Sequence, residues 1–266
     1  MKSYKKRMGI VFFLLAILTG CGTSPGIGEN TLQSKGPGGF PSVVQQVMMS
    51  LKAHTTIPLF APTFVPTGRG YLTATIQPGG VSAKSYHVNM FATKSRVAVN
   101  APSLANGNTT YPEIASFGAS RWPSSAQAIR AISAWNADEG LIPQPSEQQH
   151  AVALGYHVKA TAYTMGNNSN VTSIQWQAGR WLFEVNGNLQ VAHATLADAK
   201  QIVRFTHQTP FPGSDQAGLV IINYNTVGTH ETIQSLVIWT RGPILYHVQT
   251  TMPLNALRMA VSMKHF

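Results

Sequence analysis

Apolar and polar residues alternate in short runs from residue 71 onward, which predicts a protein made largely of β-strands. The predicted strands span residues 71–77, 86–92, 114–121, 156–165, 172–177, 180–185, 219–224, 232–239 and 244–249. Apolar residues at helical spacing predict helices at residues 43–52, from residue 124 onward, at 196–206 and at 254–263. Thr195 with Asp198 resembles a capping box at the start of the third helix. Residues 57–67 contain three prolines and are expected to lie extended along the core.

These elements recur in the order β-β-β-α. Residues 156–206 form one such unit and residues 219–263 another, and Trp176 and Trp239 each precede a turn glycine by three residues. Glycine supplies the positive φ that a tight hairpin needs. A first unit, from residue 71, has the same order without this hairpin. We therefore expect an α+β fold: antiparallel sheets from repeated β-β-β-α units, with the helices packed on one face.

The first 20 residues have the organisation of an export signal. A positive segment is formed by Lys2, Lys5, Lys6 and Arg7. The apolar run that follows, residues 9–18, is too short to span a bilayer and leads directly into Leu18-Thr19-Gly20-Cys21. This sequence resembles the lipobox of bacterial lipoprotein signal peptides, which implies cleavage before Cys21 and diacylglycerol on its thiol. A plain secretory signal with a chance cysteine is the alternative.

Four segments follow from these patterns. Residues 1–20 are the lipoprotein signal peptide, and residues 21–40, rich in Gly, Pro and Ser, are a flexible tether. An N-terminal α+β unit spans residues 41–149, and a C-terminal α+β region of two similar β-β-β-α units spans residues 150–266. The expected partner of the acylated N-terminus is membrane lipid at the extracytoplasmic face of the cell membrane. Two or three acyl chains make such an anchor stable, whereas one chain binds only marginally.

Charge is scarce in this chain: 11% of the residues are charged, against about 25% in soluble domains generally. The formal net charge is +10, and the mature chain would keep +6 after losing the four cations of the signal. With nine carboxylates, the protein has little pairing energy to lose when acid protonates them. This composition suggests tolerance of an acidic exterior, with compositional drift as the alternative.

Recognisable reaction chemistry is lacking, so we predict no enzyme, no catalytic residue, no metal site and no cofactor. Cys21 is the only cysteine, and the nine histidines form neither H-x-H nor H-E-x-x-H. The mature chain contains no G-x-S-x-G, no S-x-x-K and no glycine-rich phosphate loop between a predicted strand and helix. Export and dispersed basic residues argue against nucleic acid as a partner.

Three histidines share a local pattern, Tyr-His-Val, at His87, His157 and His247. In a strand, each His points away from its Tyr and Val neighbours. These are either three related positions gathered on one sheet face and titrating near pH 6.5, or solvent-facing residues opposite a buried Tyr and Val.

Large aromatic side chains are the remaining candidates for a binding site. Trp176 and Trp181 flank one predicted turn and, if on the same side, would form a stacking platform for sugar or peptide. Together with Trp122 and Trp239 they are our candidate ligand-contact residues. Trp122 and Trp181 are the two that we expect to be partly exposed. The alternative is that all these rings pack in the core beneath the helices.

Several short motifs carry a resemblance to known proteins: Trp176 with Gly179, Trp239 with Gly242, Tyr246, the stretch Met259-Ala260-Val261-Ser262-Met263, and Phe117-Gly118-Ala119-Ser120-Arg121-Trp122. They resemble the uncharacterised β-then-helix domains of surface lipoproteins from spore-forming and acid-dwelling Gram-positive bacteria. The resemblance implies a fold and a location but no active site. We therefore expect a non-catalytic lipoprotein that binds an envelope component, such as cell-wall polymer, lipid or a membrane protein partner. The alternatives are a structural or assembly subunit of a membrane-associated complex and a hydrolase with an unrecognised site.

Replacing Cys21 would remove the predicted lipid attachment point. We expect Cys21→Ala to leave the precursor unlipidated and to move the protein from the membrane fraction to the medium or to an uncleaved band. Detergent phase partitioning followed by immunoblotting measures this change. A processed Cys21→Ala protein that still partitions fully into detergent would contradict the lipoprotein assignment.

Overall fold

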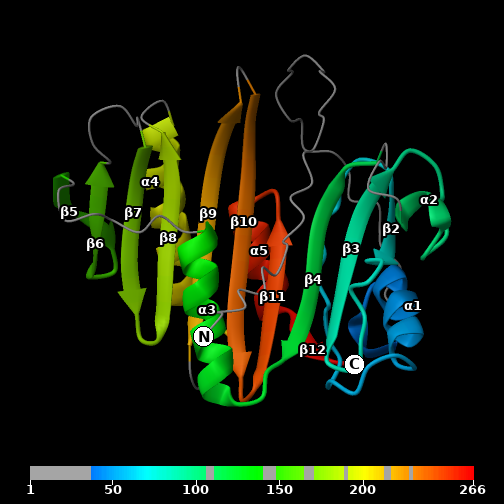
Figure 1. Ribbon diagram of the computed structural model, residues 1–266. Coiled ribbons are helices and arrows are strands. Elements are labelled where there is room, and N and C mark those ends of the chain that lie inside the picture. The colour runs from blue at the N-terminus through cyan, green and yellow to red at the C-terminus, as the bar shows by residue number, and fades with distance from the viewer. Residues whose placement is uncertain are drawn as a thin grey trace, which may run out of the picture.

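One ten-stranded sheet forms the centre of the molecule (Figure 1). In spatial order its strands are β2 (Tyr71–Ile76), β3 (Ser85–Thr93), β4 (Glu113–Arg121), β11 (Ile244–Thr250), β10 (His230–Arg241), β9 (Gly218–Val227), β8 (Trp181–Asn188), β7 (Val171–Ala178), β6 (Val158–Thr164) and β5 (Gln148–Gly155). Neighbouring strands are antiparallel except for β8 and β9, which are parallel. The expected mixed fold with a large antiparallel sheet is therefore confirmed.

The computed structural model describes residues 37–105, 111–139, 148–164, 171–188, 191–212, 217–227 and 230–266. Cys21, the signal peptide and most of the tether lie outside these ranges. Within them, β4 pairs with β11 from Ala115 opposite Thr250 to Arg121 opposite Ile244. The sheet therefore continues across the boundary that we placed near residue 149.

Helices cover both faces of this sheet. On one face, α1 (Ser42–Leu51), α4 (Ala192–Gln208) and α5 (Pro253–Val261) share a single apolar core, while α2 (Pro102–Ala105) is one turn beside β2. On the other face, α3 (Ser125–Glu139) packs against β9, β10 and β11; Figure 1 shows it in front of the sheet, with α4 and α5 behind. The expectation that helices pack on one face thus fails for α3.

The placement of α3 follows from an apolar run in β9. Leu219 and Ile221 face α3, whereas Val220 and Ile222 belong to the main core on the other face. Residues of a strand alternate between faces, so a continuous apolar run marks a strand buried on both sides. Strands β6-β7-β8 lead into α4 and β9-β10-β11 lead into α5, whereas α2 lies between β3 and β4 ahead of α3, and α3 packs on the other face.

The proline-rich segment is extended, as predicted. Within it β1 (Phe60–Pro62) pairs with β12 (Met263–His265), a strand that periodicity did not predict. Ile57, Leu59 and Val65 are buried in the main core. The proline-rich segment therefore links α1, which precedes it in the chain, to β12 near the end of the described chain.

Two local predictions were wrong. Residues 148–155, for which we predicted no strand, form the edge strand β5. Tyr156 and His157, which we expected to begin the next strand, form the turn from β5 into β6. Helix α4 begins at Ala192, one turn before the expected start, so Thr195 lies inside the helix and donates its hydroxyl to the carbonyl of Ala192. The start of α4 is instead held by the Asn188 side chain, which accepts a hydrogen bond from the Val191 N–H.

Neighbouring methionines on α1 test the predicted core. Met48 is fully buried, whereas Met49 is 61% exposed. We expect Met48→Ala to lower the free energy of unfolding by about 2–5 kcal/mol, because it removes buried methylene groups and leaves a cavity. Met49→Ala should change it by less than about 0.5 kcal/mol. Urea denaturation of both variants measures the two changes. Equal changes in the free energy of unfolding would show that α1 does not pack against the core through Met48.

Candidate ligand pocket

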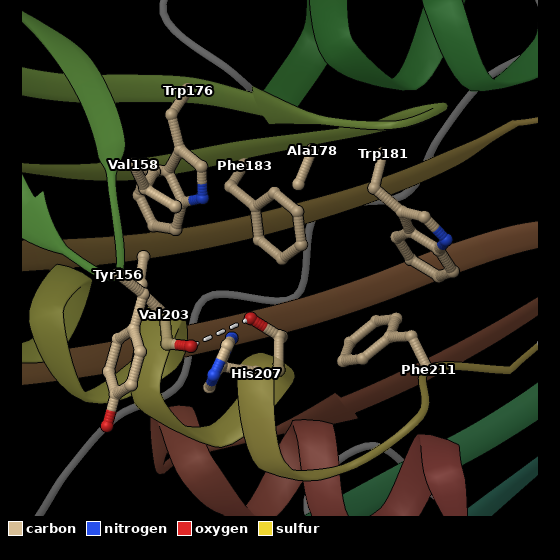
Figure 2. Close-up of a pocket in the computed structure, with 10 residues that line it drawn as sticks. Tyr156, Val158, Trp176, Ala178, Trp181, Phe183, Val203, His207 and Phe211 are labelled. Carbon is tan, nitrogen blue, oxygen red and sulfur yellow. Dashed lines mark hydrogen bonds between the residues drawn. The ribbon is translucent and has the colours of Figure 1, made fainter.

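A pocket of about 290 Å³ lies between the second half of α4 and strands β6–β8 (Figure 2). Aromatic rings form most of its wall. They are Trp176, Trp181 and Phe183 from the β7–β8 hairpin, Tyr156 from the β5–β6 turn, and Phe211 from the segment after α4. The other lining residues are Val158, Ala178, Val203, Thr206 and His207.

The β7–β8 hairpin brings three of these rings to one side of the sheet. Trp176 lies opposite Phe183, and Trp181 lies opposite Ala178. Directly opposite residues in a hairpin share a face, so both tryptophans point toward α4. The rings of Trp176 and Phe183 stack, with centroids 5.0 Å apart and planes at 5°. The arrangement required for a stacking platform, both tryptophans on the same side, is therefore present.

Trp181 is held between a ring and a glycine. Its ring meets Phe211 edge-on, with centroids 4.4 Å apart. Its other neighbour is Gly218 on the parallel strand β9, where a Cβ atom would lie only 2.3 Å from the indole. Glycine at this position is what lets the large ring lie flat on the neighbouring strand.

Tyr156 and His207 form the exposed rim. Their rings stack with centroids 4.2 Å apart, and 45% of Tyr156 is exposed. Tyr156 and its neighbour His157 have φ of 49° and 61°, the positive values that a two-residue hairpin turn requires. Asn and Gly usually occupy such positions, since other side chains are strained there. The turn thus holds Tyr156 over the end of α4 at a cost in backbone energy.

The polar side chains that line the pocket are neutral hydrogen-bonding groups or an imidazole: Tyr156, Trp176, Trp181, Thr206 and His207. None of its described lining residues has a carboxylate or an amide side chain. The Thr206 hydroxyl lies 3.0 Å from the Ile202 carbonyl and 3.2 Å from the Val203 carbonyl, so its proton is used within α4 (Figure 2). The pocket therefore has an apolar surface suited to binding and lacks a nucleophile beside a base.

The four candidate tryptophans occupy different surroundings. Trp176 and Trp181 share the pocket, with exposed fractions of 4% and 8%, so the expected partial exposure of Trp181 is wrong. Trp239 lies in the core, stacked on Tyr246. Trp122 is half-buried on the α3 side and donates its indole N–H to the Ser120 hydroxyl. The positions of Trp176 and Trp181 on either side of one predicted turn were a sequence signal for this pair. Tyr156, His207 and Phe211 come from distant segments, and no sequence signal linked them to the pocket.

Two of the three Tyr-His-Val positions meet elsewhere on the sheet. His87 on β3 and His247 on β11 both lie opposite Gly118 of the strand between them. Their rings stack over this glycine, with His87 Nδ1 2.9 Å from His247 Nε2. Their Tyr and Val neighbours are buried on the other face, as the second interpretation predicted, but the two histidines are themselves largely covered and do not face solvent as it also required. His157 does not join them, because it lies in the β5–β6 turn.

The surroundings of this pair favour neutral rings. Burial lowers the pKa of His87, against the opposing effect of a hydrogen bond with Asn89. Burial and the neighbouring His87 lower the pKa of His247 to about 3. Trp135 of α3 stacks on His247 from above, with centroids 6.2 Å apart. Within the described part of the chain, no group of three or more His, Cys, Asp or Glu side chains could hold a metal ion.

Comparison with protein-family models, with curated proteins and with solved structures found no match to this chain. Over the described ranges, none of the helices has both the length and the apolarity needed to cross a membrane.

The histidine pair predicts a loss of stability in acid. A lowered pKa in the folded state means that stability is complete above the unfolded pKa of 6.5 and declines as pH falls toward 3. We expect His247→Gln to reduce the loss between pH 6.5 and 4.5 by on the order of 2 kcal/mol. Urea midpoints at several pH values measure it, with the exposed His54→Gln as the control.

The raised pKa of Glu113, about 7 because of burial, has the opposite effect: it adds stability below its unfolded pKa of 4.5 that is lost as pH rises through 7. This contribution is common to all three proteins and cancels in the comparison. Identical pH profiles for the wild type and His247→Gln would show that the pair is not neutral in the folded protein.

Proposed function

We propose that the protein is a lipid-anchored, extracytoplasmic binding module of the cell envelope that holds its ligand in the aromatic pocket without chemical change. The observation that carries this proposal is the pocket itself. Five aromatic side chains surround a hollow of about 290 Å³. Concave surfaces lined largely by aromatic and apolar side chains are the usual form of a ligand site.

The location in this proposal rests on the lipobox resemblance at Cys21. The pocket supports binding over catalysis, because none of the lining residues that the structure describes is acidic and could act with His207. The rings of Trp176, Trp181 and Phe183 line the pocket, and each presents a small part of its surface to a ligand, because the three are 4%, 8% and 2% exposed. A hydrolase would need convergent polar groups, which the pocket walls do not supply.

A second candidate, an assembly subunit of a membrane complex, is favoured by the edge strand β5. This strand has a single neighbour, β6, and its sequence QQHAVALG has no Lys, Arg, Asp, Glu or Pro. Such residues commonly protect sheet edges from pairing with other chains. If this candidate is correct, Ala151→Lys on β5 should abolish association with the envelope, and changes in the pocket should not.

Filling the pocket tests the binding proposal. Ala178 lines the pocket, whereas the adjacent and equally exposed Gln177 points to the opposite face of β7. We expect Ala178→Trp to reduce retention of the mature chain on purified cell wall or anionic vesicles at least tenfold, because the new ring occupies the ligand space. Gln177→Trp should bind like the wild type. Co-sedimentation measures retention, and full binding by Ala178→Trp would exclude the pocket as the site.

A further inference from the structure

The solvent side of α4 is basic. His193, Lys200, Arg204 and His207 are all exposed, and their spacings of seven, four and three residues align them along one side of the helix. The single acidic residue of α4, Asp198, is half-buried and accepts a hydrogen bond from the Tyr224 hydroxyl. We call these four residues the basic stripe. It carries no carboxylate of its own to neutralise it.

The basic stripe ends at the pocket. His207 belongs to both, because it is exposed on α4 and also lines the hollow. Arg204, three residues earlier, neighbours it on the helix surface. An elongated ligand could therefore place one end among the aromatic rings and the other end on the cations of α4.

The side chains of the pocket walls determine which end of an elongated ligand would be buried there. A sugar would lose the hydrogen bonds that water makes to its hydroxyls, and the described lining replaces them only with the Tyr156 hydroxyl, two indole N–H groups, the Thr206 oxygen and His207. A hydrocarbon chain loses nothing comparable and gains about 0.8 kcal/mol for each buried CH₂. The walls thus favour an apolar chain over the sugar that the tryptophans alone suggested.

The rim lies where such a chain would enter the pocket. Tyr156 is held by a strained turn in stacking contact with His207, between the pocket and the solvent. A strained conformation persists only where the surrounding structure fixes it, and such conformations gather at functional sites.

We propose that the ligand is an anionic amphiphile whose hydrocarbon chain enters the pocket and whose head group contacts the basic stripe. This inference rests on the proposed function. Two sources share this chemistry: a free fatty acid and the acyl chain of an anionic membrane phospholipid.

The test uses the mature chain with Cys21→Ala and four probes with C12 chains or none: dodecanoate, dodecyltrimethylammonium, dodecanol and a soluble oligosaccharide. Calorimetric titration below the critical micelle concentrations gives each affinity. We expect dodecanoate to bind one per chain and at least tenfold more tightly than the cationic probe, with no binding of the oligosaccharide. Equal affinities for the anionic and cationic probes would overturn the proposal.

Two pairs of substitutions separate the contribution of charge to binding from that of the ligand's hydrocarbon chain. Lys200→Gln with Arg204→Gln should weaken dodecanoate binding about fivefold to tenfold and leave dodecanol binding unchanged. Lys84→Gln with Lys94→Gln, two exposed cations on the other half of the sheet, is the matched control and should change neither. An equal loss for dodecanoate and dodecanol would show that the stripe acts through the fold and not through charge.

The rim has its own variant. Tyr156→Asn with His157→Gly keeps the turn, relieves the positive φ and removes the ring. It should be at least as stable as the wild type and bind dodecanoate several-fold more weakly. Unchanged affinity would exclude the rim from the site.

The remaining outcomes separate this proposal from the one on which it rests. Sedimentation with phosphatidylglycerol and phosphatidylcholine vesicles distinguishes the two sources, since phospholipid capture requires binding to the former alone. Oligosaccharide binding that is lost in Ala178→Trp would keep the pocket as the ligand site and overturn the amphiphile. Envelope retention that survives Ala178→Trp, with no binding of any probe, would overturn both proposals.

Discussion

The pairing of β4 with β11 is the constraint on which the rest of the structure depends. It joins residues 115–121 to residues 244–250 and makes one sheet from strands that lie far apart in the sequence. Every other pairing in the sheet lies on one side or the other of this junction. Contacts of such long separation are costly in chain entropy, so the two ends of the sheet can form locally, but the shared core requires the junction.

Local patterns were sufficient for most individual elements and insufficient for their arrangement. Alternation of apolar and polar residues predicted the strands of the β7–β8 and β10–β11 hairpins. A glycine marked each turn, and both glycines have positive φ in the structure. Alternation could not place α3 on the face opposite α4 and α5, since that choice depends on which strands become neighbours. Strand β5 was missed because it is rich in Ala and Gln, residues with little β-preference, and follows a stretch with prolines.

The pocket owes its existence to the single parallel step in the sheet. Antiparallel neighbours are joined by short turns, but parallel strands need a crossover, and α4 supplies the one between β8 and β9. The helix lies across the sheet face, and the chain leaves it through Phe211 beside Trp181. The sequence placed Trp176 and Trp181 on either side of one turn and left open whether they share a side. The opposing wall depends on this topology and had no local signal.

The last residues of the described chain close the core. The N–H of Phe266 donates to the Leu59 carbonyl, its ring contacts Phe40, and β12 pairs with β1 beside them. Synthesis presents Phe40 and β1 well before residues 263–266, so this part of the fold cannot form until those later residues are available. Removal of residues 263–266 would leave Phe40 and β1 without these contacts, and the exposed apolar surface would make the truncated chain a target for proteolysis.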